Sequence, residues 1–422
     1  MPGLPLAGTE DVLVWKTWSH GALAQGITRV YGVGGQPPER GLVRWGSRAT
    51  TVDYPPVAIY SLAAAGALYR LHSPAFADSR WLNVAVKLPG LLAEAALAAL
   101  LWSVVRRRYG APAGRWAAAA YWANPAMILA GAVLGYLDPL MALPAVAALV
   151  AVALPLVAGG LAAIACLTKA QAVLVVPAVA IGVWNASSFG RRGRSLLAAG
   201  SATVVSAAIV LPFVAAGAWR NLVQGVGSLL QHDMLSGNAA NAWWIVTYLL
   251  RAVYAVHDLG AWGAWTMTVR ILAVSRFVAI GYPNPRPLAM AAVAATAAWT
   301  LGRVRQAVRM PPLAAAAAVI VHAYFVLGLQ VHENHLYLAV PLLAAAAAVQ
   351  PDLRPVLIAV SSVFALNLYL FAGFGRDFPL PPRNVTLIDE TVLLAVANCA
   401  VFVWHARRFA AAAAADARAT AA

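Results

Sequence analysis

Residues 312–349 read PLAAAAAVIVHAYFVLGLQVHENHLYLAVPLLAAAAAV, and this stretch decides the fold class. Its two apolar runs, 312–330 and 335–349, flank one polar motif, Val331-His332-Glu333-Asn334-His335. A helix of about 20 apolar residues crosses the hydrocarbon core of a bilayer. The stretch therefore predicts two membrane helices joined by a polar turn.

Similar apolar runs recur along the whole chain. The sequence is 62% hydrophobic and 11% charged, whereas a soluble domain is roughly half apolar and a quarter charged. No run alternates with the period of a strand, so a helical bundle is favoured over a barrel. We predict an all-α, polytopic transmembrane helical bundle of about 11–13 spans with outer juxtamembrane helices. The expected spans are 84–104, 115–133, 137–154, 156–170, 171–187, 196–215, 286–302, 312–330, 335–349, 354–373 and 388–406.

The basic residues indicate which side of the membrane each loop faces. The net charge is +15, and the 30 basic residues are almost all arginine. Arginine clusters lie in the loops 106–115, 191–194, 303–309 and 407–408. Cytoplasmic loops carry such an excess, so we expect these loops and the C-terminus in the cytoplasm. Because the arginines lie between apolar spans, we expect the lipid bilayer, and no nucleic acid, as a partner.

This topology divides the chain into three parts. Residues 1–82 form an outer loop with juxtamembrane helices that carry the candidate catalytic acid. Residues 83–408 form the transmembrane bundle with a large outer segment at 216–285, and 409–422 form a low-complexity cytoplasmic tail. Charges interrupt 242–283, which fits either an outer amphipathic region or two crossings. The N-terminus lacks the features of a signal peptide, so whether a transmembrane helix precedes it stays open.

The 15 acidic residues point to an active site on the outer face. All except Glu94, Asp352 and Asp416 fall on that side of the topology. A carboxylate near a bilayer is costly unless it has a function or a partner. Asp11 precedes an expected amphipathic interfacial helix, and Asp53 precedes a helix that begins with proline. Each acid would serve equally well as a helix cap or a first-turn acid.

Three further polar residues lie at the outer ends of expected spans. Asp138 lies in a turn before proline, where aspartate is common for turn chemistry alone. Lys169, followed closely by Gln171, places a cation at a helix end. This lysine either snorkels to the interface or offers a point charge to the phosphate of a lipid.

The late motif and the outer segment contain the remaining candidates. His332 and His335 are three residues apart, so they share a helix face, but metalloprotease ligands are four apart. We therefore expect no metal or other cofactor. A divalent metal could assist the chemistry, but no ligand cluster in the sequence supports one. The amides and rings of Asn238, Asn241 and Trp243 suit a carbohydrate pocket and are also ordinary interfacial residues.

In their order along the chain, these motifs resemble those of the polytopic GT-C glycosyltransferases. The resemblance is to the lipid-phosphate-sugar-dependent glucosyltransferases that extend the N-glycan precursor. Those enzymes carry an acid seven residues before a tryptophan, then Leu-Asp-Tyr-Pro-Pro-Leu, Lys-Gln and Val-His-Glu-Lys motifs. The matching positions here are Asp11 with Trp18, the run Val52-Asp53-Tyr54-Pro55-Pro56-Val57, Lys169 with Gln171 at an offset of one residue, and Val331-His332-Glu333-Asn334.

The resemblance implies a reaction and a place in the cell. A hexosyltransferase of this kind moves a sugar from a polyprenyl-phosphate-linked donor to a lipid-linked or glycan acceptor on the outer face, with inversion. Asp11 is then the general base. The protein is expected to be a bacterial plasma-membrane protein. Donor contacts fall to Lys169, Gln171, His332, Glu333 and His335, and the substrate pocket falls to Asp53, Tyr54, Asp138, Asn238, Asn241 and Trp243.

The sequence departs from the family pattern in three places. Asn334 replaces the last lysine, Leu137-Asp138-Pro139 replaces a His-Phe-Gln segment, and the first transmembrane helix of the family is missing. The alternative function is a polytopic transporter or flippase for a lipid-linked or small substrate. That class predicts internal repeats and a charged site at the midplane, whereas Glu94 is the one acid well inside an expected span.

Overall fold

The computed structural model describes residues 3–32, 42–186, 190–228, 232–256, 269–386 and 388–421. The chain forms two compact units, and both draw on segments that are distant in sequence. Unit 1 contains Met1–Val104, Ile128–Gln231 and Phe374–Phe378. Unit 2 contains Val105–Met127, His232–Gly373 and Pro379–Ala422.

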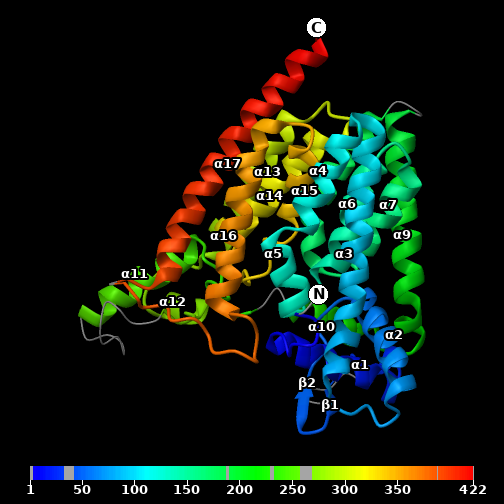
Figure 1. Ribbon diagram of the computed structural model, residues 1–422, viewed down its shortest axis with the longest axis vertical. Coiled ribbons are helices and arrows are strands. Elements are labelled where there is room, and N and C mark those ends of the chain that lie inside the picture. Colours follow the sequence, from blue (N-terminus) through cyan, green and yellow to red (C-terminus); the bar gives the residue numbers. More distant parts are fainter. Residues whose placement is uncertain are drawn as a thin grey trace. The chain divides into compact units, whose positions relative to one another are not determined.

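The N-terminal part of unit 1 contains two short helices, α1 (Glu10–Ala24) and α2 (Pro56–His72) (Figure 1). Proline suits the first turn of α2, because a backbone N–H there would have no partner within the helix. The sequence predicted that the first helix is amphipathic, and this is wrong. Nine of the 15 residues of α1 are buried, because α2 and a hairpin both pack against it.

That hairpin pairs β1 (Val43–Trp45) with β2 (Arg48–Thr50) in antiparallel register. Its turn contains Gly46, whose φ of +59° is a conformation that favours glycine. The sequence does not predict the hairpin, since strands of three residues are too short to show an alternating pattern.

The remaining helices of unit 1 form a bundle in which α7 packs against both α6 and α9. The π-helix η2 precedes α6, and the 3-10 helix η3 precedes α8. Their bounds are η1 (Ile27–Arg29), α3 (Arg80–Tyr109, up to Val104), η2 (Leu129–Leu134), α6 (Asp138–Val150), α7 (Pro155–Cys166), η3 (Ala170–Leu174), α8 (Val176–Asn185), α9 (Arg191–Ala215) and α10 (Trp219–Ser228).

Unit 2 is built around α14 (Met310–Leu327), which is buried along nearly its whole length. It packs against α13, α15 and α17, and its run of five alanines lets neighbouring helices approach closely. The other elements of unit 2 are α4 (Ala111–Trp122), α5 (Pro125–Ile128, up to Met127), α11 (Ala242–Val256), α12 (Val274–Ala279), α13 (Arg286–Arg303), α15 (Ala339–Ala347), η5 (Pro351–Leu353), α16 (Arg354–Ala372) and α17 (Glu390–Ala421).

Each of the expected spans is helical over most of its length, which confirms the all-α polytopic fold. Within the described ranges, five helices are long and apolar enough to cross a membrane alone, or six if α4 is joined with residues 125–134. They are α3, α9, α14, α16 with η5, and α17. The expected tail at 409–422 continues α17 as far as Ala421.

Candidate functional site

An aromatic cluster in unit 1 holds the loop before α2 against α1. The Tyr54 ring centroid lies 5.0 Å from that of Trp15 and 5.6 Å from that of Trp18. The Trp15 indole donates a hydrogen bond to the Gly135 carbonyl at 3.1 Å, and the Trp18 indole donates to Thr51 at 3.1 Å. Both tryptophans therefore orient Tyr54 through ring packing and through backbone anchors.

The same cluster brings two acids together. Asp11 lies four residues before Trp15 and seven before Trp18, so it occupies the same face of α1. Asp53 directly precedes Tyr54. The pKa of the Asp53 carboxyl is raised to about 6, chiefly by burial and to a smaller extent by the charge of Asp11. Two carboxylates thus influence each other next to the Tyr54 ring.

A buried ion pair lies on the Tyr54 ring. The Lys169 ammonium is 2.8 Å from an Asp138 carboxylate oxygen, and both side chains are almost fully buried. The same ammonium lies 5.7 Å from the Tyr54 ring centroid, within reach of a cation–π interaction. The sequence indicates Lys169 as a cation for phosphate and Asp138 as a pocket residue, but it does not predict that they pair. Gln171 lies close by in η3 and is half-buried.

The segment that carries Asp11 is held by a lysine that the sequence analysis did not single out. Lys87 of α3 is buried, and its ammonium donates to the carbonyls of Leu6, Ala132 and Val133 at 2.9, 3.2 and 2.8 Å. It thereby links the residues before α1 to the end of η2. The sequence does indicate that Lys87 is unusual, because it is a lysine inside an apolar run. Such residues are costly in a membrane and have specific partners.

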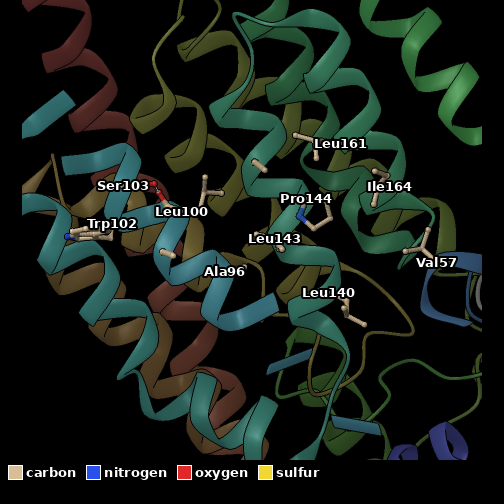
Figure 2. Close-up of a pocket in the computed structure, with 12 residues that line it drawn as sticks. Val57, Ala96, Leu100, Trp102, Ser103, Leu140, Leu143, Pro144, Leu161 and Ile164 are labelled. Atoms are coloured by element: carbon tan, nitrogen blue, oxygen red, sulfur yellow. Dashed lines mark hydrogen bonds between the residues drawn. The ribbon is translucent and has the colours of Figure 1, made fainter. Parts of the chain in front are cut away.

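Unit 1 also contains an apolar cavity of about 780 Å³. Figure 2 shows its lining, which comes from α3, α6, α7 and Val57 at the start of α2. Ala96, Ala99 and Trp102 are exposed, so the cavity reaches the surface of unit 1. The Val57 amide donates to the Leu167 carbonyl at 2.9 Å, two residues before Lys169. The cavity and the ion pair are therefore linked through the backbone.

The late motif in unit 2 gathers three histidines. His332 Nε2 lies 3.4 Å from His232 Nδ1, and the His332 amide donates to His335 Nδ1 at 3.2 Å. The Tyr324 hydroxyl lies 3.5 Å from the same His335 nitrogen. Across the described parts of the chain, no group of three or more His, Cys, Asp or Glu side chains is arranged to hold a metal ion.

A short extended segment pairs with this motif. Gly237 and His332 form a parallel bridge, and the Gly237 amide donates to the Val331 carbonyl at 2.8 Å. A side chain at Gly237 would collide with the His332 ring, whose Nδ1 lies 2.9 Å from the position of its Cβ. Asn238 follows in the left-handed region with φ of +62°, which asparagine tolerates better than most residues. The fold thus brings Asn238 next to His332.

The other predicted residues of unit 2 make structural contacts. Asn241 is fully buried, and its carbonyl oxygen accepts the Trp244 amide at 3.0 Å at the start of α11. The Trp243 indole donates to the Leu327 carbonyl at 2.8 Å. Glu333 is half-buried, and its backbone carbonyl accepts a hydrogen bond from Asn367. Substrate contacts of these residues stay predictions.

The six predicted residues of unit 1 are Asp11, Asp53, Tyr54, Asp138, Lys169 and Gln171. The six of unit 2 are Asn238, Asn241, Trp243, His332, Glu333 and His335. Five residues of unit 1 are connected through the Tyr54 ring and its neighbours. In unit 2, the Gly237–His332 bridge connects the outer segment with the late motif.

The chain is similar to two proteins of known structure. ArnT from Cupriavidus metallidurans, bound to undecaprenyl phosphate, matches with a TM-score of 0.47 and 14% identity, over 95% of this chain and 72% of that chain. The oligosaccharyltransferase of Archaeoglobus fulgidus in the apo form matches with a TM-score of 0.43 and 13% identity, over 97% of this chain and 52% of that chain. This chain thus spans about half the length of the oligosaccharyltransferase.

No protein-family model matches the chain, and no curated protein is significantly similar to it in sequence. Its helices and their apolar surfaces define it as a multi-pass integral membrane protein.

Proposed function

We propose that the protein is a membrane glycosyltransferase that moves a sugar from a polyprenyl-phosphate-linked donor to an acceptor hydroxyl on the outer face of the membrane. The observation that carries the proposal is the arrangement around Tyr54. Unit 1 contains a pair of acids, an aromatic ring and a buried lysine, and a backbone hydrogen bond of Val57 links this region to an apolar cavity that reaches the surface of unit 1. Transfer from such a donor requires an acid to act as the base, a cation for the phosphate and an apolar cavity for the prenyl chain.

In the proposed reaction, Asp11 is the general base. Its carboxylate accepts the proton of the acceptor hydroxyl, whose oxygen forms a bond to the anomeric carbon of the sugar. The bond between that carbon and the phosphate oxygen breaks, and the phosphate leaves with the electron pair. Attack opposite to the leaving group inverts the anomeric configuration. Because a phosphate is stable as an anion, no strong general acid is needed, unlike in a glycosidase.

The two acids have different roles in this proposal. The raised pKa of Asp53, about 6, means that it holds a proton over a wider pH range than an ordinary aspartate. Asp11, whose negative charge raises the pKa of Asp53, is the proposed base. Asp53 is proposed to hold the acceptor through a hydrogen bond.

Lys169 and the cavity are proposed to receive the donor. A lysine ammonium has three hydrogen-bond donors, and the Asp138 carboxylate accepts one of them. The remaining donors suit a phosphate oxygen. The apolar cavity, whose one polar lining side chain is Ser103, suits a prenyl chain. For unit 2, the donor contacts of His332, Asn238 and Trp243 stay predictions from the sequence.

The experiment is to incubate purified protein in lipid with a panel of polyprenyl-phosphate sugars and an acceptor, and to measure release of polyprenyl phosphate. Asp11→Asn removes the base but little volume, so transfer should fall at least about a hundredfold while donor binding persists. Glu10→Gln is the matched control, because the neighbouring Glu10 is exposed and pairs with Arg376 at 2.7 Å.

Two results would count against the proposal. Full transfer by the Asp11→Asn variant would remove this carboxylate from the mechanism. Vesicle experiments in which an intact lipid-linked sugar crosses the bilayer without transfer would favour the flippase alternative.

A further inference from the structure

Asn367 is a buried polar residue inside a membrane helix. It lies on α16 within the apolar span expected at 354–373, and it is 1% exposed. An uncompensated amide in such surroundings is costly, so its hydrogen bonds indicate what the position is for. The sequence alone does not indicate a role for it, because a single asparagine in an apolar run has no motif around it.

Both ends of the Asn367 amide bind the backbone of the candidate site in unit 2. Its carbonyl oxygen accepts the Ala240 N–H at 2.8 Å. Its NH₂ group donates to the Glu333 carbonyl at 3.0 Å. One side chain therefore joins the extended segment at 237–241 to the late motif at 331–335, and its length sets the distance between them.

Other bonds hold the same segment from the opposite side. The Asn398 amide of α17 donates to the Ala240 carbonyl at 2.8 Å, and its oxygen lies 3.0 Å from His322 Nε2. The Gly237 amide donates to Val331. With both its N–H and its carbonyl bound, Ala240 is held in one position between α16 and α17.

We infer that Asn367 is a positioning residue of the active site, an inference that rests on the proposed transferase function. It touches no reacting atom. It fixes the segment bearing Asn238 against His332, so that these two side chains keep a single geometry relative to each other. Misplacement of such groups by a fraction of an ångström to an ångström lowers the rate steeply.

Asn367→Leu tests the inference, because leucine has a similar volume and makes neither hydrogen bond. The matched control is Ser361→Ala on the same helix, which removes a buried hydrogen bond of 2.8 Å from Asn124 and touches neither segment. The first measurement is hydrogen–deuterium exchange of peptides covering 236–246 and 328–338. Exchange in both peptides should be faster in Asn367→Leu and unchanged in Ser361→Ala.

The second measurement is sugar transfer with the donor panel. We expect Asn367→Leu to lower kcat at least about tenfold, with Ser361→Ala within about twofold of the wild type. Asn367→Asp is the conservative variant, because a protonated carboxyl has both the acceptor and the donor that the two backbone groups need. Its kcat relative to the wild type should rise as the pH is lowered from 8 to 5.5, which a purely structural defect would not produce.

The outcomes separate this inference from the proposed function. Unchanged exchange in Asn367→Leu would overturn the link between the two segments. Faster exchange with unchanged kcat would overturn the positioning role. Absence of transfer by the wild type with every donor would refute the proposed function, whereas the exchange data would still decide whether Asn367 joins the segments.

Discussion

The Lys169 ammonium and the Asp138 carboxylate form an ion pair of 2.8 Å in which the two side chains are only 4% and 2% exposed. Their residues lie on different elements, at the start of η3 and of α6. A charge in such surroundings is stable only with a partner. The pair therefore connects two helices of unit 1, and it also places the cation against the Tyr54 ring.

Removing one partner of this pair should destabilise the protein strongly. Asp138→Asn leaves the Lys169 charge uncompensated, and we expect the free energy of unfolding to fall by about 3–5 kcal/mol. Thermal unfolding in detergent measures the change. In the control, Glu10→Gln breaks an exposed pair with Arg376 and should cost no more than about 1 kcal/mol.

Replacing both partners should restore much of that stability. The double variant Asp138→Leu with Lys169→Met leaves no buried charge, and apolar replacements of buried pairs are often neutral or stabilising. The same double variant should lose sugar transfer, since the cation is gone. A double variant as unstable as Asp138→Asn alone would show that the ion pair is not the source of the loss.

The stability of the protein should depend on pH through Asp53. Its pKa in the folded protein is about 6, above the ordinary value of 3.8, so the folded state binds this proton more tightly than the unfolded state. The stabilisation that comes from protonating Asp53 is fully present below pH 3.8 and is lost as the pH rises through about 6. Melting temperatures between pH 4 and 7.5 should therefore decline with pH. In Asp53→Asn, the decline of the melting temperature that Asp53 causes should disappear. If the melting temperature of the variant falls with pH as steeply as that of the wild type, Asp53 is not its source.

The orientation of the N-terminal part can be tested with a single cysteine. Ser47 lies in the exposed turn of the β1–β2 hairpin, and the topology from loop charges places it outside. In Ser47→Cys, a membrane-impermeant thiol reagent should label intact cells. The counterpart is Gln306→Cys in the exposed basic loop after α13, which should react only after lysis. The opposite pattern would invert the topology.

The helices of this protein could be predicted from local sequence. The apolar runs are helical because a backbone in a bilayer must satisfy its own hydrogen bonds. The start of α2 at Pro56 is local as well, because a backbone N–H in the first turn would have no partner within the helix. The candidate residues could also be named from short motifs. Their contacts could not be predicted, because Asp138 and Lys169 or Ala240 and Asn367 are distant in sequence.

The amino-acid sequence by itself determined a helical membrane protein whose acids lie mostly in a few polar segments between apolar helices, since helix formation and loop charge are local properties. Tertiary structure decided how those acids are used. It buried α1 on several sides, brought the Asp53 carboxyl within electrostatic range of Asp11, and turned Lys169 toward Asp138. The physical reason is that the free energy of a buried charge or amide depends on its partner, and only the packed helices supply that partner.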